Sequence, residues 1–167
     1  MKKLCIAFTT VLALVIASCT GDQGPPGSPG IDGGQIVSQA FEINVNFTAA
    51  NNFEQVESYG FQVLPTDVTL VYILWDTVNG QDIWRLLPQT VEFNDGLLIY
   101  NFDFTQTDVR FFLDGTTNFN TLDASYTQAQ VFRVVVVPAD NVGRVDVNDL
   151  DSVMNVYGIQ TFDEHYL

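Results

Sequence analysis

VTLVYILW at residues 68–75 and VFRVVVV at residues 131–137 are apolar at nearly every position. A strand with one face in water alternates apolar and polar residues, whereas a strand buried on both faces reads as an almost continuous apolar run. These two stretches therefore predict central strands of a sheet that is covered on both sides.

Further strands are predicted on the N-terminal side of these stretches. Residues 35–47 alternate apolar positions such as Phe41, Ile43 and Val45 with polar ones, the pattern of a strand with one wet face. Residues 59–64 predict a shorter strand.

Turn residues divide the middle of the chain into hairpins. Asn-Gly and Asp-Gly pairs favour tight turns because both residues tolerate positive φ. The predicted turns are Asn79-Gly80 between 68–78 and 82–87, Asn94-Asp95-Gly96 between 89–93 and 97–105, and Asp114-Gly115 after 109–113. Pro88 interrupts residues 83–93, which indicates an edge position or a bend. About seven to eight short strands separated by turns predict a mainly β fold, an antiparallel β-sandwich over residues 35–167.

One short helix is predicted near the C-terminus. Leu150, Val153, Met154 and Tyr157 recur at helical spacing, and this apolar stripe favours packing on the core over a cofactor site. Either Asp146 or Asn148 is expected to cap its start, and Gly158 its end.

The sequence opens with the features of an export signal. Lys2 and Lys3 precede a mostly apolar run over residues 4–17 that is too short to span a bilayer, and residues 16–19 read Ile-Ala-Ser-Cys. This segment resembles the bacterial lipobox, which implies a lipoprotein signal peptide over residues 1–18, cleavage between Ser18 and Cys19, and acylation of Cys19. An uncleaved N-terminal helix or an ordinary signal peptide is the alternative. The other cysteine, Cys5, lies in the segment to be removed, so no disulfide is expected in the mature chain.

Glycine then recurs at every third position from Gly21 to Gly33, with prolines between, over the segment 19–34. This is the Gly-X-Y period of collagen, in which only glycine fits at the axis of three chains. So few triplets form few interchain hydrogen bonds to offset the entropy cost of ordering three chains. The sequence therefore favours a semi-rigid spacer of about 40 Å on a monomer over a trimerising stalk.

The mature chain is strongly acidic. Removal of residues 1–18 leaves four arginines and no lysine against 20 acidic residues, a formal net charge of −16. Phosphate contacts need Lys or Arg, so nucleic acid is not an expected partner, and adsorption to anionic headgroups is disfavoured for the same reason. A soluble acidic surface is the favoured interpretation, with divalent cations or a cationic partner as the alternative.

Asp140, Asp146 and Asp149 match the third, ninth and twelfth places of an EF-hand-type calcium loop whose turn glycine is Gly143. The first and fifth places hold Pro138 and Val142, so the loop supplies too few oxygen ligands. Helix capping and a solvated loop are favoured over calcium, and no metal or cofactor is predicted.

No catalytic constellation is evident. The single histidine, His165, lies close to the C-terminus, where chains commonly fray, and the spacing of acids such as Asp95, Asp103 and Asp108 selects no pair for acid–base chemistry. Core packing is expected for most of the aromatic residues. The alternative for Trp75 and Trp84, which flank the Asn79-Gly80 turn, is that they approach each other across the hairpin and offer a platform for a sugar or a protein partner.

The segments CTGDQGPPG at 19–27, DIWRLLPQ at 82–89, YNFDFTQTD at 100–108 and QVFRVVVVP at 130–138 together resemble a family of collagen-like bacterial lipoproteins, over the whole chain. The resemblance brings no catalytic residues. Two tripeptides, 76–78 and 151–153, are similar to short sites of bacterial O-glycosylation, which makes Thr77 and Ser152 candidate acceptors.

These features predict a lipid-anchored protein of the bacterial cell envelope. The outer membrane is favoured, because Thr20 stands where an aspartate would resemble an inner-membrane retention signal. The expected activity is that of a non-enzymatic structural or binding module for a protein or glycan ligand, displayed on its spacer. The alternative is a sandwich-fold hydrolase that cleaves glycan or peptide with two carboxylates.

Overall fold

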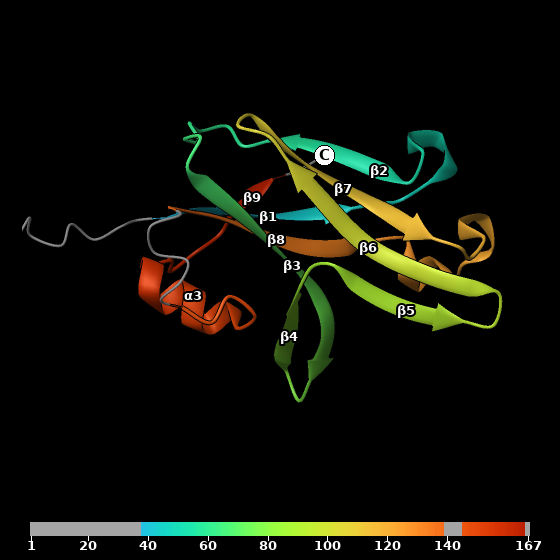
Figure 1. Ribbon diagram of the computed structural model, residues 1–167. Coiled ribbons are helices and arrows are strands. Elements are labelled where there is room, and N and C mark those ends of the chain that lie inside the picture. The colour runs from blue at the N-terminus through green and yellow to red at the C-terminus, as the bar shows by residue number, and fades with distance from the viewer. Residues whose placement is uncertain (1–37, 139–144, 166–167) are drawn as a thin grey trace, which may run out of the picture. The chain divides into compact units, whose positions relative to one another are not determined.

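The computed structural model describes residues 38–138 and 145–165 (Figure 1). The strands are β1 (Gln39–Val45), β2 (Glu54–Ser58), β3 (Asp67–Val78), β4 (Gln81–Leu86), β5 (Gln89–Phe93), β6 (Gly96–Phe104), β7 (Asp108–Gly115), β8 (Gln130–Pro138) and β9 (Asp163–His165). The helices are the 3-10 turns η1 (Ala49–Asn51), η2 (Phe119–Thr121) and η3 (Ala124–Tyr126), and the α-helix α3 (Leu150–Tyr157).

The strands form two sheets. The first has the order β4-β3-β8-β1-β9 and the second the order β2-β7-β6-β5. All paired neighbours are antiparallel except β9, which runs parallel to β1. The predicted mainly β, two-sheet fold is therefore confirmed, and the described residues contain nine strands where about seven to eight were expected.

Two of the three predicted turns are present. The third prediction, Asp114-Gly115, is wrong, because both residues belong to β7 and pair with Ile99 and Leu98 of β6. Asn79 and Gly80 join β3 to β4 with φ of 53° and 79°, the positive values that this residue pair tolerates. Residues 94 and 95 join β5 to β6. Pro88 lies where the chain leaves β4, at one edge of the first sheet, and enters β5, at one edge of the second.

The main core fills the space between the sheets. Phe41, Ile43 and Phe132 enter it from the first sheet, and Tyr100 and Phe111 from the second, all of them buried. The rings of Phe132 and Phe111 lie 4.9 Å apart across the layers. Contacts of this kind join the two sheets.

The helix α3 accounts for the apolar outer face of β3 and β8. Leu150, Val153 and Tyr157 pack against a buried row that includes Tyr72 and Val135 on the face turned away from the main core. The prediction that these strands are covered on both sides is confirmed, with the second sheet on one side and α3 on the other (Figure 1).

The ends of α3 confirm one predicted cap and correct the other. Gly158 takes the left-handed C-cap conformation with φ of 67°. The N-cap is Asp149, whose side chain accepts a hydrogen bond from the Asp151 backbone N–H at 3.1 Å, and neither Asp146 nor Asn148 holds that position. The Asp146 carboxylate instead accepts from the Asn148 backbone N–H at 3.0 Å, in the turn before the helix.

The strand predicted at 59–64 is wrong. The strand lies earlier, at Glu54–Ser58, and residues 59–64 are irregular. Tyr59 and Val63 are buried in the main core all the same, because loop residues fill the end of the sandwich there. The apolar residues in this stretch are therefore buried without being part of a strand.

None of the described helices is long and apolar enough to cross a bilayer.

Candidate functional site

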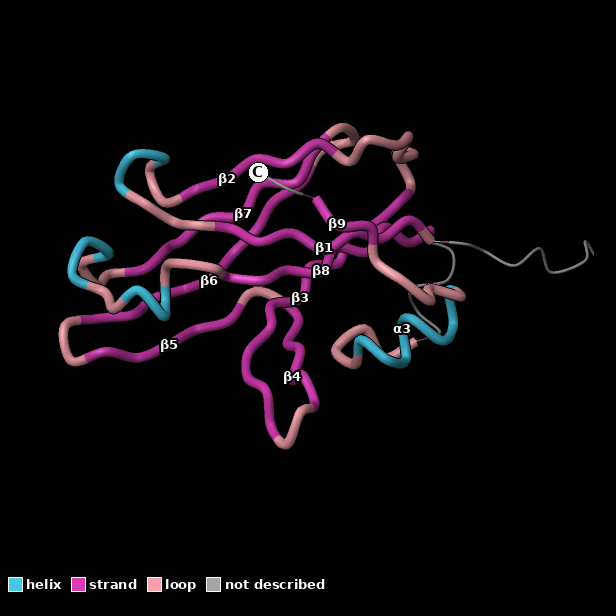
Figure 2. The backbone as a smooth tube through the Cα atoms, turned by 180° about the vertical axis from the view of Figure 1, so that it is seen from behind, coloured by secondary structure: helices cyan, strands magenta, loops and turns pink. Residues whose placement is uncertain are grey.

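The two sheets are bridged by side chains along one long side of the sandwich and diverge along the other. On one side, β9 of the first sheet and β2 of the second are joined by His165 and Glu57, whose side chains lie 2.7 Å apart, while the His165 ring stacks on Phe41 at 4.2 Å. On the other side, the β3–β4 hairpin projects away from the β5–β6 pair (Figure 2). A register shift between Leu74 and Asp76 marks the start of that divergence.

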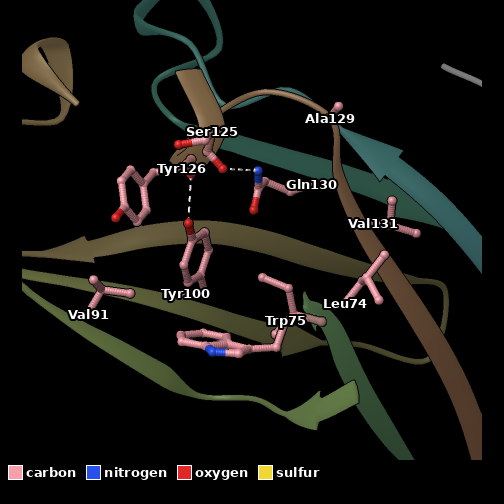
Figure 3. Close-up of a pocket in the computed structure, with 10 residues that line it drawn as sticks. Leu74, Trp75, Val91, Tyr100, Ser125, Tyr126, Ala129, Gln130 and Val131 are labelled. Atoms are coloured by element: carbon pink, nitrogen blue, oxygen red, sulfur yellow. Dashed lines mark hydrogen bonds between the residues drawn. The ribbon is translucent and has the colours of Figure 1, made fainter. Parts of the chain in front are cut away.

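A pocket of about 370 Å³ lies on this second side (Figure 3). Its lining comes from both sheets and from the turn η3. The lining residues are Ile73, Leu74, Trp75, Val91, Tyr100, Ser125, Tyr126, Ala129, Gln130 and Val131. This size lies near the lower end of the range for small-molecule sites.

Hydrogen bonds fix the η3 side of the pocket. The Tyr100 hydroxyl donates to the Tyr126 backbone carbonyl at 2.8 Å, and the Gln130 side-chain amide donates to the Ser125 carbonyl at 2.9 Å (Figure 3). Burial raises the pKa of the Tyr100 phenol well above its usual range, so this hydroxyl remains protonated and able to donate. The wall is therefore formed before any ligand arrives.

Trp75 is held in place at the mouth of the hairpin. The Arg85 guanidinium lies 4.2 Å from the centroid of its ring, a cation–π contact. Trp75 lines the pocket, whereas Arg85 is not among the lining residues. Within the described part of the chain, neither the Trp75 indole N–H nor the Tyr126 hydroxyl makes a hydrogen bond.

The described lining residues are all uncharged, and none is a histidine, cysteine or acid. The acids singled out in the sequence are not among the lining residues and are engaged by other side chains. Asp103 pairs with Arg110, which lowers the pKa of Asp103, and the Thr117 hydroxyl bonds Asp95 at 2.7 Å and lowers the pKa of Asp95. The Asp108 carboxylate accepts from the Thr105 hydroxyl at 2.8 Å.

The two tryptophans pack against different clusters and do not form the common platform that was the alternative to core packing. Trp75 packs against the core between the sheets, whereas Trp84 packs against the cluster under α3. Trp84 is stacked on Arg133 at 4.0 Å, and Phe162 lies over the same guanidinium at 4.5 Å. The bulge at Trp75 breaks the simple cross-strand register that this alternative assumed.

The remaining predicted sites have the following places. Ser18, Cys19 and Asp140 lie outside the described residues, so the lipid anchor stays a prediction and the calcium alternative stays untested at Asp140. Asp146 and Asp149 serve a turn and the cap of α3, and the described residues hold no group of three potential metal ligands. Thr77 is exposed on the β3–β4 hairpin, and its hydroxyl donates to Asp82 at 2.9 Å. The Ser152 hydroxyl donates to Asp149 at 2.6 Å.

His165 is not frayed: it is part of β9 and bonded to Glu57.

Sequence reasoning singled out Trp75 as a binding candidate and missed the other lining residues, Tyr100 and Tyr126 among them. Tyr100 alternates with Leu98 along β6, and this period of two could have placed it on the core face. Tyr126 lies in a 3-10 turn between η2 and β8, for which the periodicity gives no signal.

Comparisons with protein-family models, with curated proteins and with solved structures gave no match to this chain.

Proposed function

We propose that the chain is a lipid-anchored protein of the bacterial cell envelope whose β-sandwich is a non-enzymatic binding module. The observation that carries the binding role is the Trp75 pocket, which combines aromatic surface with uncharged polar groups and a wall fixed by internal hydrogen bonds. Such a combination is typical of a preformed small-ligand site.

The same lining supports binding over turnover. Hydrolysis of a glycan or peptide by acid–base chemistry needs a proton donor and a base within hydrogen-bond reach of the substrate. The described lining offers tyrosine, serine, glutamine and tryptophan, and its one strongly shifted group, Tyr100, has its pKa moved away from neutral pH by burial.

The envelope location rests on the sequence. The basic start, the short apolar run and the small residues before Cys19 support export and acylation, and Gly21 to Gly33 support a spacer between lipid and domain. With a formal charge of −16, the mature chain gains little from anionic headgroups, so the lipid would supply the membrane affinity.

Cys19→Ser should move the protein from the membrane fraction to the soluble fraction, because acylation supplies the apolar surface that holds the bilayer. The measurement is detergent-phase partition of the full chain expressed in a bacterium. Cys5→Ser is the matched control, since it changes the only other cysteine and should leave the protein in the membrane. Equal membrane retention of both variants would contradict the anchor.

The binding role is tested by incubating the full-length protein, purified in detergent, with neutral oligosaccharides and with peptides. We expect binding without product formation. Turnover that a single Asp→Asn change abolishes would support the hydrolase instead.

A further inference from the structure

We propose that the Trp75 pocket binds a neutral sugar, with one pyranose ring packed on the Trp75 indole. This inference rests on the proposed function, because it names the ligand class of the same pocket. It starts from the chemical character of the lining, which is aromatic and polar but uncharged.

Charge excludes two other ligand classes. An anionic ligand would meet a mature chain with a formal charge of −16 and no lysine, and no arginine lines the pocket. A cationic ligand would lose water on entry and find no carboxylate in the lining to pair with. A neutral ligand avoids both costs.

The polar groups of the lining argue against a purely apolar ligand. The Trp75 indole N–H and the Tyr126 hydroxyl make no hydrogen bond within the described part of the chain and depend on solvent. An apolar ligand that covered either group would leave it without a hydrogen-bond partner. A ligand that fits must present hydroxyl or carbonyl groups at the same positions.

A pyranose ring meets both requirements. Its C–H face can cover the indole, and its hydroxyl groups can both donate and accept hydrogen bonds. The Arg85 guanidinium packs on the indole, and the hydrogen bonds from Tyr100 and Gln130 fix the turn that carries Tyr126. A site formed in advance loses little conformational entropy on binding. An extended peptide that adds to the open edge of β5 is the competing ligand that the experiment has to separate.

The test uses calorimetric titration of the full-length protein in detergent. The probes are hexasaccharides of β-linked glucose, α-linked glucose, xylose, mannose and N-acetylglucosamine, with hexagalacturonate as the anionic arm and a pool of uncharged hexapeptides as the peptide arm. We expect at least one neutral hexasaccharide to bind, and hexagalacturonate to bind more weakly.

Trp75→Ala should weaken that binding about tenfold or more, as expected for a central aromatic contact. Trp84→Ala is the matched control on the same hairpin but against the other cluster, and it should change binding less than about twofold. Tyr126→Phe removes a single hydroxyl, keeps the fold, and should weaken binding if Trp75→Ala proves unstable. Equal losses of hexasaccharide affinity in Trp75→Ala and Trp84→Ala would overturn the proposal. It would also be overturned if a folded Trp75→Ala variant and the Tyr126→Phe variant both bound the hexasaccharide as tightly as the wild type.

The different probes distinguish a failure of this inference from a failure of the proposed function. Suppose that peptides bind at Trp75 and that no neutral hexasaccharide binds at 10 mM, a concentration on the order of the weakest useful affinities. This result would contradict the inference that the ligand is a sugar, but it would agree with the proposed binding module. Cleavage of a bound hexasaccharide would contradict the non-enzymatic function, but it would agree with the inference that the ligand is a neutral sugar.

Discussion

Phe132 is a buried residue of the main core whose ring contacts a ring of the opposite sheet. It is fully buried on β8, lies 4.9 Å from the Phe111 ring of the second sheet, and meets Phe47 edge to face at 6.1 Å. Its contacts therefore span both layers of the sandwich.

Phe132→Ala should lower the free energy of unfolding by about 3 to 5 kcal/mol, because it removes buried apolar surface and leaves a cavity between the sheets. Urea denaturation measures this loss. Val56→Ala, at a side chain that is 50% exposed, is the control and should stay within about 0.5 kcal/mol of wild type. A loss below about 1 kcal/mol for Phe132→Ala would mean that the layers do not meet at this ring.

Gly115 is required by a close approach of two strands. A Cβ on this residue would lie 2.0 Å from the Leu97 carbonyl oxygen, and its φ of 130° disfavours a side chain as well. Gly115→Ala should therefore destabilise the fold by at least about 2 kcal/mol in the same urea measurement. Gly60→Ala has positive φ but open space around it, and should cost only about 1 kcal/mol. If Gly115→Ala and Gly60→Ala lost the same free energy of unfolding, the close approach to Leu97 would not contribute to the cost.

At the scale of elements, α3 is fixed to the outer face of the first sheet through its apolar stripe and its first turn. Tyr72 on β3 donates to the Val147 carbonyl at 2.6 Å, just before the helix. Asp149 then caps the helix, and the hydroxyl of Ser152 bonds its carboxylate, which lowers the pKa of Asp149.

This cap makes part of the stability depend on pH. Because the folded pKa of Asp149 is lowered, its contribution is present above the ordinary aspartate value of 3.8 and is lost as pH falls through the folded value. Asp149→Asn should keep the cap, since asparagine also accepts the backbone hydrogen bond, but should lose less stability between about pH 5 and pH 2.5. Urea denaturation at both pH values measures the difference. An unchanged pH dependence would show that the Asp149 carboxylate is not stabilised in the fold.

Much of the element structure could be predicted from the sequence. The apolar runs at 68–75 and 131–137 are covered on both faces, and the Asn79-Gly80 turn is where its chemistry requires it. The stretch 59–64 could not be assigned correctly, because burial in a loop leaves the same apolar residues as burial in a strand. The pocket could not be predicted either, since it depends on a bulge at Trp75 and on a 3-10 turn at Tyr126, neither of which follows a periodic pattern.

At the scale of the whole molecule, the chain forms an acidic domain with an uncharged pocket at Trp75, and we propose that a lipid tethers this domain to a membrane. The two tryptophans of the chain lie in different clusters, Trp75 at the pocket and Trp84 under α3. A ligand in the pocket should therefore affect one indole and leave the other unchanged.

The most direct measurement is a two-dimensional proton–nitrogen NMR spectrum of the full-length protein in detergent, recorded with and without the tightest-binding neutral hexasaccharide. The indole N–H signal of Trp75 should move together with the backbone signals of Ser125, Tyr126 and Gln130. The indole signal of Trp84 should stay in place, and no cleaved sugar should appear. Movement of Trp84 with Trp75 unchanged, or growth of product signals, would contradict a non-enzymatic module that binds its ligand at the Trp75 pocket.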